Sequence, residues 1–384
     1  MPVRQLLIIQ YCTVLVMAAL YTPQPLQPVL AAHFGVGESQ ASLLIAVTML
    51  PLAIAPIFYG FLLQRWSARR LLQVSLWILA LAQVSVYFVQ HFEVLLGIRF
   101  IQGLAIPAML TGLMTYVGAS AAEGQIARVM AIYIASTVMG GFLGRALSGI
   151  FAANWGWRWS FLIFGLASII GALLLTRLRA DPPVKFQKLG LEPIRAVLSH
   201  GRFLRLYIVV FLSFGAFASV LNFLPYRLVE LDLGLSEAGI GLMYSGYLMG
   251  VLVSLVSLRV ASGIGGTVNA MLLGLVILAL AMLFFAQQPL WLLFTATFVL
   301  CAGMFLFHSL APGLMNETDI GHRGVVNGLY VSFYYSGGTV GSFLPGFVYQ
   351  GFGWYAYLWL LVALISIAGA MLWTIRRPRP AAAG

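Results

Sequence analysis

The sequence predicts an all-α membrane protein of twelve helices in two six-helix bundles, and three observations carry this prediction. Of the 384 residues, 61% are hydrophobic and only 8% are charged, whereas roughly 25% are charged in an ordinary soluble domain. Apolar stretches long enough to cross a bilayer, about 18 residues or more, recur along nearly the whole chain. The two halves also share residues at one constant offset of 197 positions.

Six apolar spans are expected in each half, separated by charged or turn-rich breaks. In the first half they lie near residues 6–32, 39–63, 71–90, 93–117, 127–153 and 158–178. In the second half they lie near residues 204–228, 236–259, 267–286, 290–315, 324–350 and 354–375. We therefore expect an N-terminal bundle over 1–178 and a C-terminal bundle over 204–384.

Residues 179–203 are expected to form a cytoplasmic linker, because their prolines and basic residues cannot span a bilayer. Leu191, Ile194, Val197 and Leu198 recur at helical spacing, which fits an amphipathic helix on the membrane surface. A flexible loop is the alternative that the spacing leaves open.

The basic residues predict the orientation of the chain, since Lys and Arg accumulate in cytoplasmic loops. With both termini inside, 17 of the 21 Lys and Arg residues are cytoplasmic, and only Arg158 and Arg227 lie outside. The remaining two, Arg99 and Arg145, lie within spans. We expect a multi-pass protein of the cell inner membrane that keeps its first span as an anchor. The net charge of +11 is then a topology signal, and no nucleic-acid partner is expected.

The repeat is clearest in the fifth and eleventh spans. Gly140, Gly144 and Gly149 match Gly337, Gly341 and Gly346, and Pro28 matches Pro225, without a gap. A constant offset predicts that the two bundles are related by a pseudo-two-fold axis along the membrane normal.

The fourth span carries the most specific motif. Its sequence, LLGIRFIQGLAIPA, places Arg99, Gln102 and Gly103 in an R-x-x-Q-G pattern. Here the chain resembles the major facilitator superfamily (MFS), and the resemblance covers all twelve spans. It implies the MFS fold and a role for Arg99 in proton coupling or in the polar network beside it. The alternative is that Arg99 only holds helices together by hydrogen bonds to backbone carbonyls, because a buried arginine needs partners.

The loop after the second span resembles the family's gating motif only in part. Gly60, Arg65 and Arg69 fit, but Gln64 stands where an acidic residue is expected. The resemblance implies a lock on the cytoplasmic gate, and simple positive-inside anchoring explains the arginines equally well.

The fifth span, MGGFLGRALSG, is similar to the family's antiporter signature. Gly140, Gly144 and Gly149 would let two helix backbones approach closely in lipid. Arg145 occupies a place where the family usually has proline, at a depth similar to that of Arg99. One hypothesis is that Arg145 and Arg99 form an anion-accepting patch in the cavity. The alternative is that Arg145 extends outward or lies on another face of its helix.

Titratable groups are scarce within the spans, because no Asp or Glu lies in the middle of any of them. The candidates for proton coupling are therefore Arg99, Glu93 at the outer end of the fourth span, and His308 within the tenth. A histidine has an ordinary pKa near neutrality and suits a relay. A hydrogen-bonded packing residue is the alternative for His308.

Cavity-lining residues are suggested by the first span, which contains YTPQPLQP. Its prolines interrupt the helix, and broken helices at corresponding places in two halves point to a binding site. We expect Gln24, Gln27 and, in the seventh span, Asn222 to line the cavity. Tyr330 and Tyr334 form an aromatic stripe in the eleventh span, for ligand stacking or plain packing.

The family resemblance implies a secondary active transporter that works by alternating access. It favours export of a drug-like molecule, sugar or metabolite by proton antiport, with uptake or exchange of an organic anion as the alternative. No constellation typical of an enzyme, metal site or cofactor site is visible. The expected partners are a small-molecule substrate, protons and the lipid bilayer, and we expect a monomer.

Overall fold

The computed structural model describes residues 2–120, 126–179, 191–318 and 323–376. These residues form helices and no β-strand, which confirms the all-α prediction. Contacts between residues divide the chain into two compact units. Unit 1 comprises residues 1–189 and 221–245, and unit 2 comprises residues 190–220 and 246–384.

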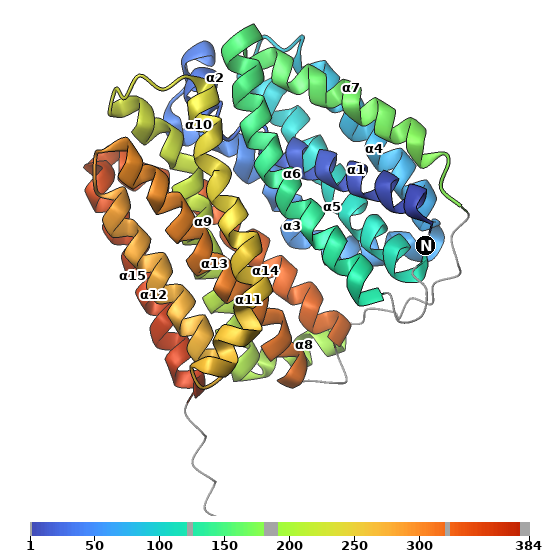
Figure 1. Ribbon diagram of the computed structural model, residues 1–384. Coiled ribbons are helices and arrows are strands. Elements are labelled where there is room, and N and C mark those ends of the chain that lie inside the picture. Colours follow the sequence, from blue (N-terminus) through green and yellow to red (C-terminus); the bar gives the residue numbers. More distant parts are fainter. Residues whose placement is uncertain (1, 121–125, 180–190, 319–322, 377–384) are drawn as a thin grey trace, which may run out of the picture. The chain divides into compact units, whose positions relative to one another are not determined.

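Unit 1 contains seven helices of the first half of the chain together with a segment of the second half (Figure 1). The seven helices are α1 (Val3–Tyr21), α2 (Gln27–Phe34), α3 (Glu38–Arg65), α4 (Ala68–Val86), α5 (Phe92–Ser120), α6 (Ile126–Trp155) and α7 (Trp157–Leu175). The segment 221–245 holds the end of α9 (Gly201–Glu230) and all of α10 (Glu237–Met243).

Unit 2 contains the first part of α9 and the remaining helices. These are α8 (Leu191–Ser199), α11 (Tyr247–Gly263), α12 (Thr267–Phe285), α13 (Leu290–Thr318), α14 (Arg323–Phe343) and α15 (Pro345–Arg376). A short 3₁₀ helix, Tyr244–Gly246, separates α10 from α11. Helix α8 covers the stretch of the linker where the residue spacing predicted a helix, and its place on the membrane surface stays a prediction. Residues 180–190 of the linker lie outside the described part of the chain.

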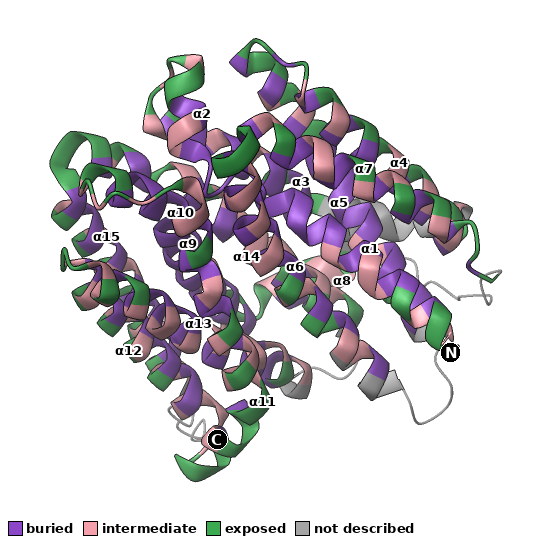
Figure 2. Ribbon diagram, turned by 45° about the horizontal axis from the view of Figure 1, so that its top comes forward, coloured by how far each residue is buried: buried purple, intermediate pink, exposed green. Residues whose placement is uncertain are grey.

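The exposed faces of the described helices carry many large apolar side chains, which is unfavourable in water. Nine of them are long and apolar enough to cross a membrane, or ten if α2 and the start of α3, bent by 119°, form one span. Leu255 and Leu258 on α11 are 76% and 75% exposed, and exposed residues lie along the outer faces of the helices (Figure 2). Surfaces of this kind belong in lipid. The expected number of twelve spans stays a prediction.

The first span is broken where its prolines predict it. Helix α1 ends at Tyr21, and α2 begins only at Gln27. Pro23 and Pro25 occupy the connection, and neither has a backbone N–H to continue the helical ladder. The last carbonyls of α1 are therefore available to side chains.

The repeat reappears as pairs of equivalent contacts. A Cβ atom on Gly140 would lie 2.6 Å from the Val14 carbonyl oxygen, and one on Gly337 would lie 2.2 Å from that of Phe211. Val14 and Phe211 are themselves 197 positions apart. The same holds one turn later, where Gly144 faces Ala18 and Gly341 faces Gly215. Each unit thus contains the same close helix crossing, α1 with α6 and α9 with α14.

Turns repeat at the same offset. Gly156 and Gly353 have φ angles of 92° and 80°, and Gly353 kinks α15. Gly35 (φ 64°) corresponds to Asp232, the one described non-glycine residue with positive φ, at 49°. Non-glycine residues rarely adopt this conformation, and Asp is among those that tolerate it. The duplication therefore extends to backbone geometry.

Candidate functional site

Arg99 is fully buried in unit 1 and joins three helices. Its Nε donates to the Leu44 carbonyl of α3 at 3.0 Å. Its Nη1 and Nη2 donate to the carbonyls of Ala19 and Leu20 in α1 at 2.9 and 2.7 Å. A cation is favoured at a helix C-terminus by the helix dipole. The break after Tyr21 thus gives Arg99 its partners, and the arrangement is the carbonyl tie considered above.

A line of glutamines continues from Arg99. Arg99 Nη1 donates to Gln102 Oε1 at 2.5 Å, and Gln102 Nε2 donates to Gln83 Oε1 at 3.2 Å. Both glutamines are fully buried. The sequence motif indicated Gln102, whereas Gln83 lies on α4 in no recognisable pattern and was missed.

Arg145 is also buried, with 1% of its surface exposed, so its side chain does not extend outward. Its Nη1 donates to the Gly141 carbonyl at 2.7 Å. Its guanidinium lies over the ring of Tyr21 at 3.8 Å from the centroid, and 5.0 Å from the centroid of Tyr244. Such cation–π contacts strengthen when they are desolvated. These contacts of Arg145 are all with neutral groups.

Amide side chains link Arg145 to the start of α2 and to α9. Arg145 Nε donates to Gln24 Oε1 at 2.6 Å. Gln24 Nε2 donates to Asn222 Oδ1 at 3.4 Å, and Gln27 Nε2 donates to the same oxygen. Three residues predicted to line a cavity, Gln24, Gln27 and Asn222, therefore form one hydrogen-bonded chain with Arg145, which we call the amide chain.

The amide chain leaves one polar atom unsatisfied. Gln27 Oε1 is buried and has no hydrogen-bond partner in the described part of the chain. A buried acceptor without a partner destabilises a protein by about 1–3 kcal/mol. An unsatisfied group of this kind in a native structure calls for an explanation, such as a ligand or an ordered water.

Segment 221–245 packs against α6 beside Arg145, within unit 1. A Cβ atom on Gly149 would lie 2.2 Å from the Glu237 carbonyl oxygen, and one on Gly241 would lie 2.7 Å from that of Arg145. Gly149 thus lies at a close contact between α6 and α10. Tyr244, at the end of α10, brings its ring to Arg145. Neither Tyr21 nor Tyr244 was identified from sequence, because isolated tyrosines in apolar spans carry no pattern.

Unit 2 holds three more of the predicted site residues, His308, Tyr330 and Tyr334. The Tyr330 hydroxyl and His308 Nδ1 lie 2.5 Å apart and share a hydrogen bond. The His308 ring is 4.7 Å from that of Tyr334, which stacks on Phe214 at 3.5 Å. The expected aromatic stripe is therefore a cluster around one histidine.

Other predicted residues lie apart from these clusters. Glu93 is exposed in the first turn of α5. Arg69 donates to the carbonyl of Thr176, at the end of α7, at 2.5 Å. Gly103 packs α5 against α3, where its Cβ would lie 2.7 Å from the Thr48 carbonyl oxygen. The side chains at Gly60 and Arg65 lie outside the described residues.

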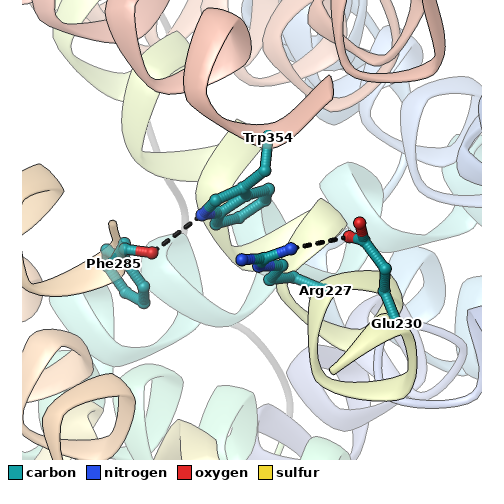
Figure 3. Close-up of polar contacts among 4 residues, drawn as sticks. All are labelled: Arg227, Glu230, Phe285 and Trp354. Carbon is teal, nitrogen blue, oxygen red and sulfur yellow. Dashed lines mark hydrogen bonds and ion pairs between the residues drawn. The ribbon is translucent and has the colours of Figure 1, made fainter. Parts of the chain in front are cut away.

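One further polar contact in each unit helps to fix a helix end (Figure 3). In unit 1, Arg227 pairs with Glu230 at 3.1 Å across one turn of α9. In unit 2, Trp354 Nε1 donates to the Phe285 carbonyl at 2.7 Å, next to the kink at Gly353. Both contacts lie near helix termini, outside the buried clusters.

Sequence comparisons find relatives that cover most of the chain. The family model of the Major Facilitator Superfamily matches residues 11–264 and 206–384. An uncharacterized MFS-type transporter of Bacillus subtilis, YybF, is 24% identical over 91% of this chain and 88% of its own length. The inner membrane transport protein YnfM of Escherichia coli is 25% identical over 92% of this chain and 87% of its own.

Solved structures show the same fold. A mutant of the nucleoside transporter NupG superposes with a TM-score of 0.84 at 15% identity, over 97% of this chain and 99% of that one. A bacterial homolog of the human lysosomal transporter Spinster, inward-facing and unoccupied, gives 0.78 at 15% identity, over 99% of both chains.

Proposed function

The chain belongs to the Major Facilitator Superfamily, and on this premise we propose that it is a secondary active transporter that exports a small polar molecule by proton antiport. Buried polar side chains are expensive inside a membrane and mark the path of a substrate or ion. The amide chain with Arg145 is the observation that carries the proposal, because it buries a cation and three amides among apolar helices.

Proton coupling is assigned to His308. Its half-buried ring hydrogen-bonds the Tyr330 hydroxyl and lies 4.7 Å from the Tyr334 ring, and these contacts support the assignment. Glu93, by contrast, is exposed at a helix end. The close crossing of α1 and α6 through Gly140 and Gly144 supports antiport, because these glycines resemble the antiporter signature.

The direction and coupling are tested in everted vesicles that contain the protein and a pH-sensitive dye. Antiport predicts that adding a transported compound releases protons from acid-loaded vesicles. His308→Gln should abolish this proton release while exchange of labelled substrate across the membrane continues. Proton release that survives in the variant would exclude His308 as the carrier.

Uptake or exchange of an organic anion is a second candidate, favoured by one specific observation. Arg145 is a buried cation in the amide chain, and a buried cation attracts an anionic ligand group. Accumulation of a labelled organic acid in intact cells would favour this candidate.

We further propose a monomer in the cell inner membrane with both termini in the cytoplasm.

A further inference from the structure

The amide chain has a direction that is fixed by its first member. An arginine side chain only donates hydrogen bonds. Because Arg145 Nε lies 2.6 Å from a terminal atom of Gln24, that atom must be the amide oxygen. The Gln24 nitrogen then faces Asn222, which must in turn present its oxygen. The assignment of each amide thus follows from chemistry, where coordinates alone leave oxygen and nitrogen ambiguous.

The last member of the chain inherits this direction. Asn222 Oδ1 is an acceptor, so Gln27 must donate to it through Nε2. The atom that remains on Gln27 is therefore the oxygen, which is buried and has no partner among the described residues. An arginine at one end of the chain forces a free acceptor at the other end.

From this geometry we propose that Gln27 Oε1 accepts a hydrogen bond from an O–H group of the transported molecule. Arg145 is the positioning residue that keeps this oxygen directed toward the substrate. The substrate class is a small hydroxylated compound. The inference rests on the proposed transport function, since it takes the amide chain as part of the substrate site. It is independent of the direction of transport and of the charge of the substrate.

Two matched pairs of probes test donor recognition on the full-length protein in nanodiscs. Gluconate and hexanoate share a carboxylate and six carbons, but only gluconate has hydroxyl donors. Glucose and its penta-O-methyl ether share a ring, but only glucose can donate. The readout is the rise in unfolding temperature with probe concentration. In at least one pair, we expect the hydroxylated probe to protect and its partner not to.

Variants connect that preference to the amide chain. Gln27→Leu should weaken binding of the hydroxylated probe by about tenfold, as for one lost hydrogen bond. Gln83→Leu is the matched control, since Gln83 is a buried glutamine with an unpaired Nε2 in the separate line from Arg99. It should leave the preference unchanged.

Arg145 variants test the fixed direction. Arg145→Lys still only donates and should keep the preference for the hydroxylated probe. Arg145→Gln can also accept, so the amides can reverse and present the Gln27 nitrogen, and the preference should fall. A preference that is equal in both variants would refute the role of Arg145.

Failure of donor recognition and failure of the transport proposal are distinguishable. If neither pair discriminates, or if Gln27→Leu binds the hydroxylated probe as the wild type does, an ordered water or nothing fills the site and the inference is overturned, even if vesicles transport. If discrimination is present but everted vesicles release no protons, recognition stands and export by antiport fails.

Discussion

Arg99 shows how one side chain can bind three helices together where water is absent. Its three carbonyl partners belong to α1 and α3, and α5 carries the arginine itself. Two of these carbonyls are exposed to it only because α1 stops at Tyr21. The break after Tyr21 therefore supplies the carbonyls that bind Arg99. Arg145 contacts the ring of Tyr21, so both buried arginines contact the same end of α1.

We expect Arg99→Lys to lower the free energy of unfolding by about 2–5 kcal/mol, although it keeps the charge. A single ammonium cannot reach carbonyls on both α1 and α3 and also Gln102, and each buried carbonyl left unpaired contributes about 1–3 kcal/mol. Thermal unfolding of purified protein measures this effect. Arg158→Lys, near a helix end, is the control. An equally small change in the free energy of unfolding in both variants would show that the hydrogen bonds from Arg99 to the carbonyls are unimportant for stability.

At the scale of helices, small residues decide how closely backbones pack. A Cβ atom on Gly144 would lie 2.5 Å from the Cα of Ala18, which leaves no room for any side chain. Gly144→Leu should therefore force α6 away from α1 and destabilise the protein by about 1–3 kcal/mol or more. Gly341→Leu should act alike, because Gly341 meets Gly215 in the same way.

Gly97 provides the control for this prediction. It also lies within a helix, α5, but nothing is found within 4 Å of the Cβ that it would carry. Gly97→Ala should raise stability by about 0.5–1 kcal/mol, because alanine restricts the unfolded chain. Unfolding temperatures in detergent compare the three variants. Equal stability of Gly144→Leu and wild type would contradict the close crossing.

Helix positions were largely predictable from sequence, because membrane spans need continuous apolar residues and prolines cannot extend a helix. The break after Tyr21 and the glycine crossings followed from these local rules. The membership of segment 221–245 in unit 1 did not, because it depends on contacts between residues far apart in the chain. Gln83 and Tyr244 were missed for the same reason, and Glu93 was selected by composition although its helix turns it outward.

At the scale of the whole molecule, the two halves of the sequence share a framework but not their polar residues. The glycine crossings and turns repeat at the offset of 197, whereas Arg99 corresponds to Ala296 and Arg145 to Ser342. Gln24 and Gln27 likewise correspond to Leu221 and Leu224. Residues that set the helix packing were thus retained in both copies, and the buried polar chemistry differs. We infer that the two halves of the sequence contribute different chemistry to transport.

The orientation of the chain is testable with two exposed positions. Positive residues predict that Ser67 faces the cytoplasm and Asn154 the outside. In a background without Cys12 and Cys301, Asn154→Cys should react with a membrane-impermeant maleimide in intact cells. Ser67→Cys should react only after the cells are permeabilised. The reverse pattern would place the termini outside.

Alternating access predicts that the packing of α10 on α6 is released during transport. Ala146 is 4% exposed and lies under Gly241, whose Cβ would be 3.3 Å from its Cα. A reporter cysteine, Ala146→Cys, should therefore react slowly with maleimide while α10 is in place. Gly149→Leu should act as a wedge, since its side chain would meet the Glu237 carbonyl, and should speed the labelling of the reporter.

The same wedge should impair transport, because it holds α10 away from α6 and prevents the site from closing on that side. Gly97→Leu in the reporter background is the matched control, with the same added bulk on a helix face that meets no described atom within 4 Å of its Cβ. Labelling rates and vesicle transport are measured on the same preparations. If the wedge leaves both unchanged, α10 and α6 do not separate in the cycle, and the gate that segment 221–245 would form must lie elsewhere.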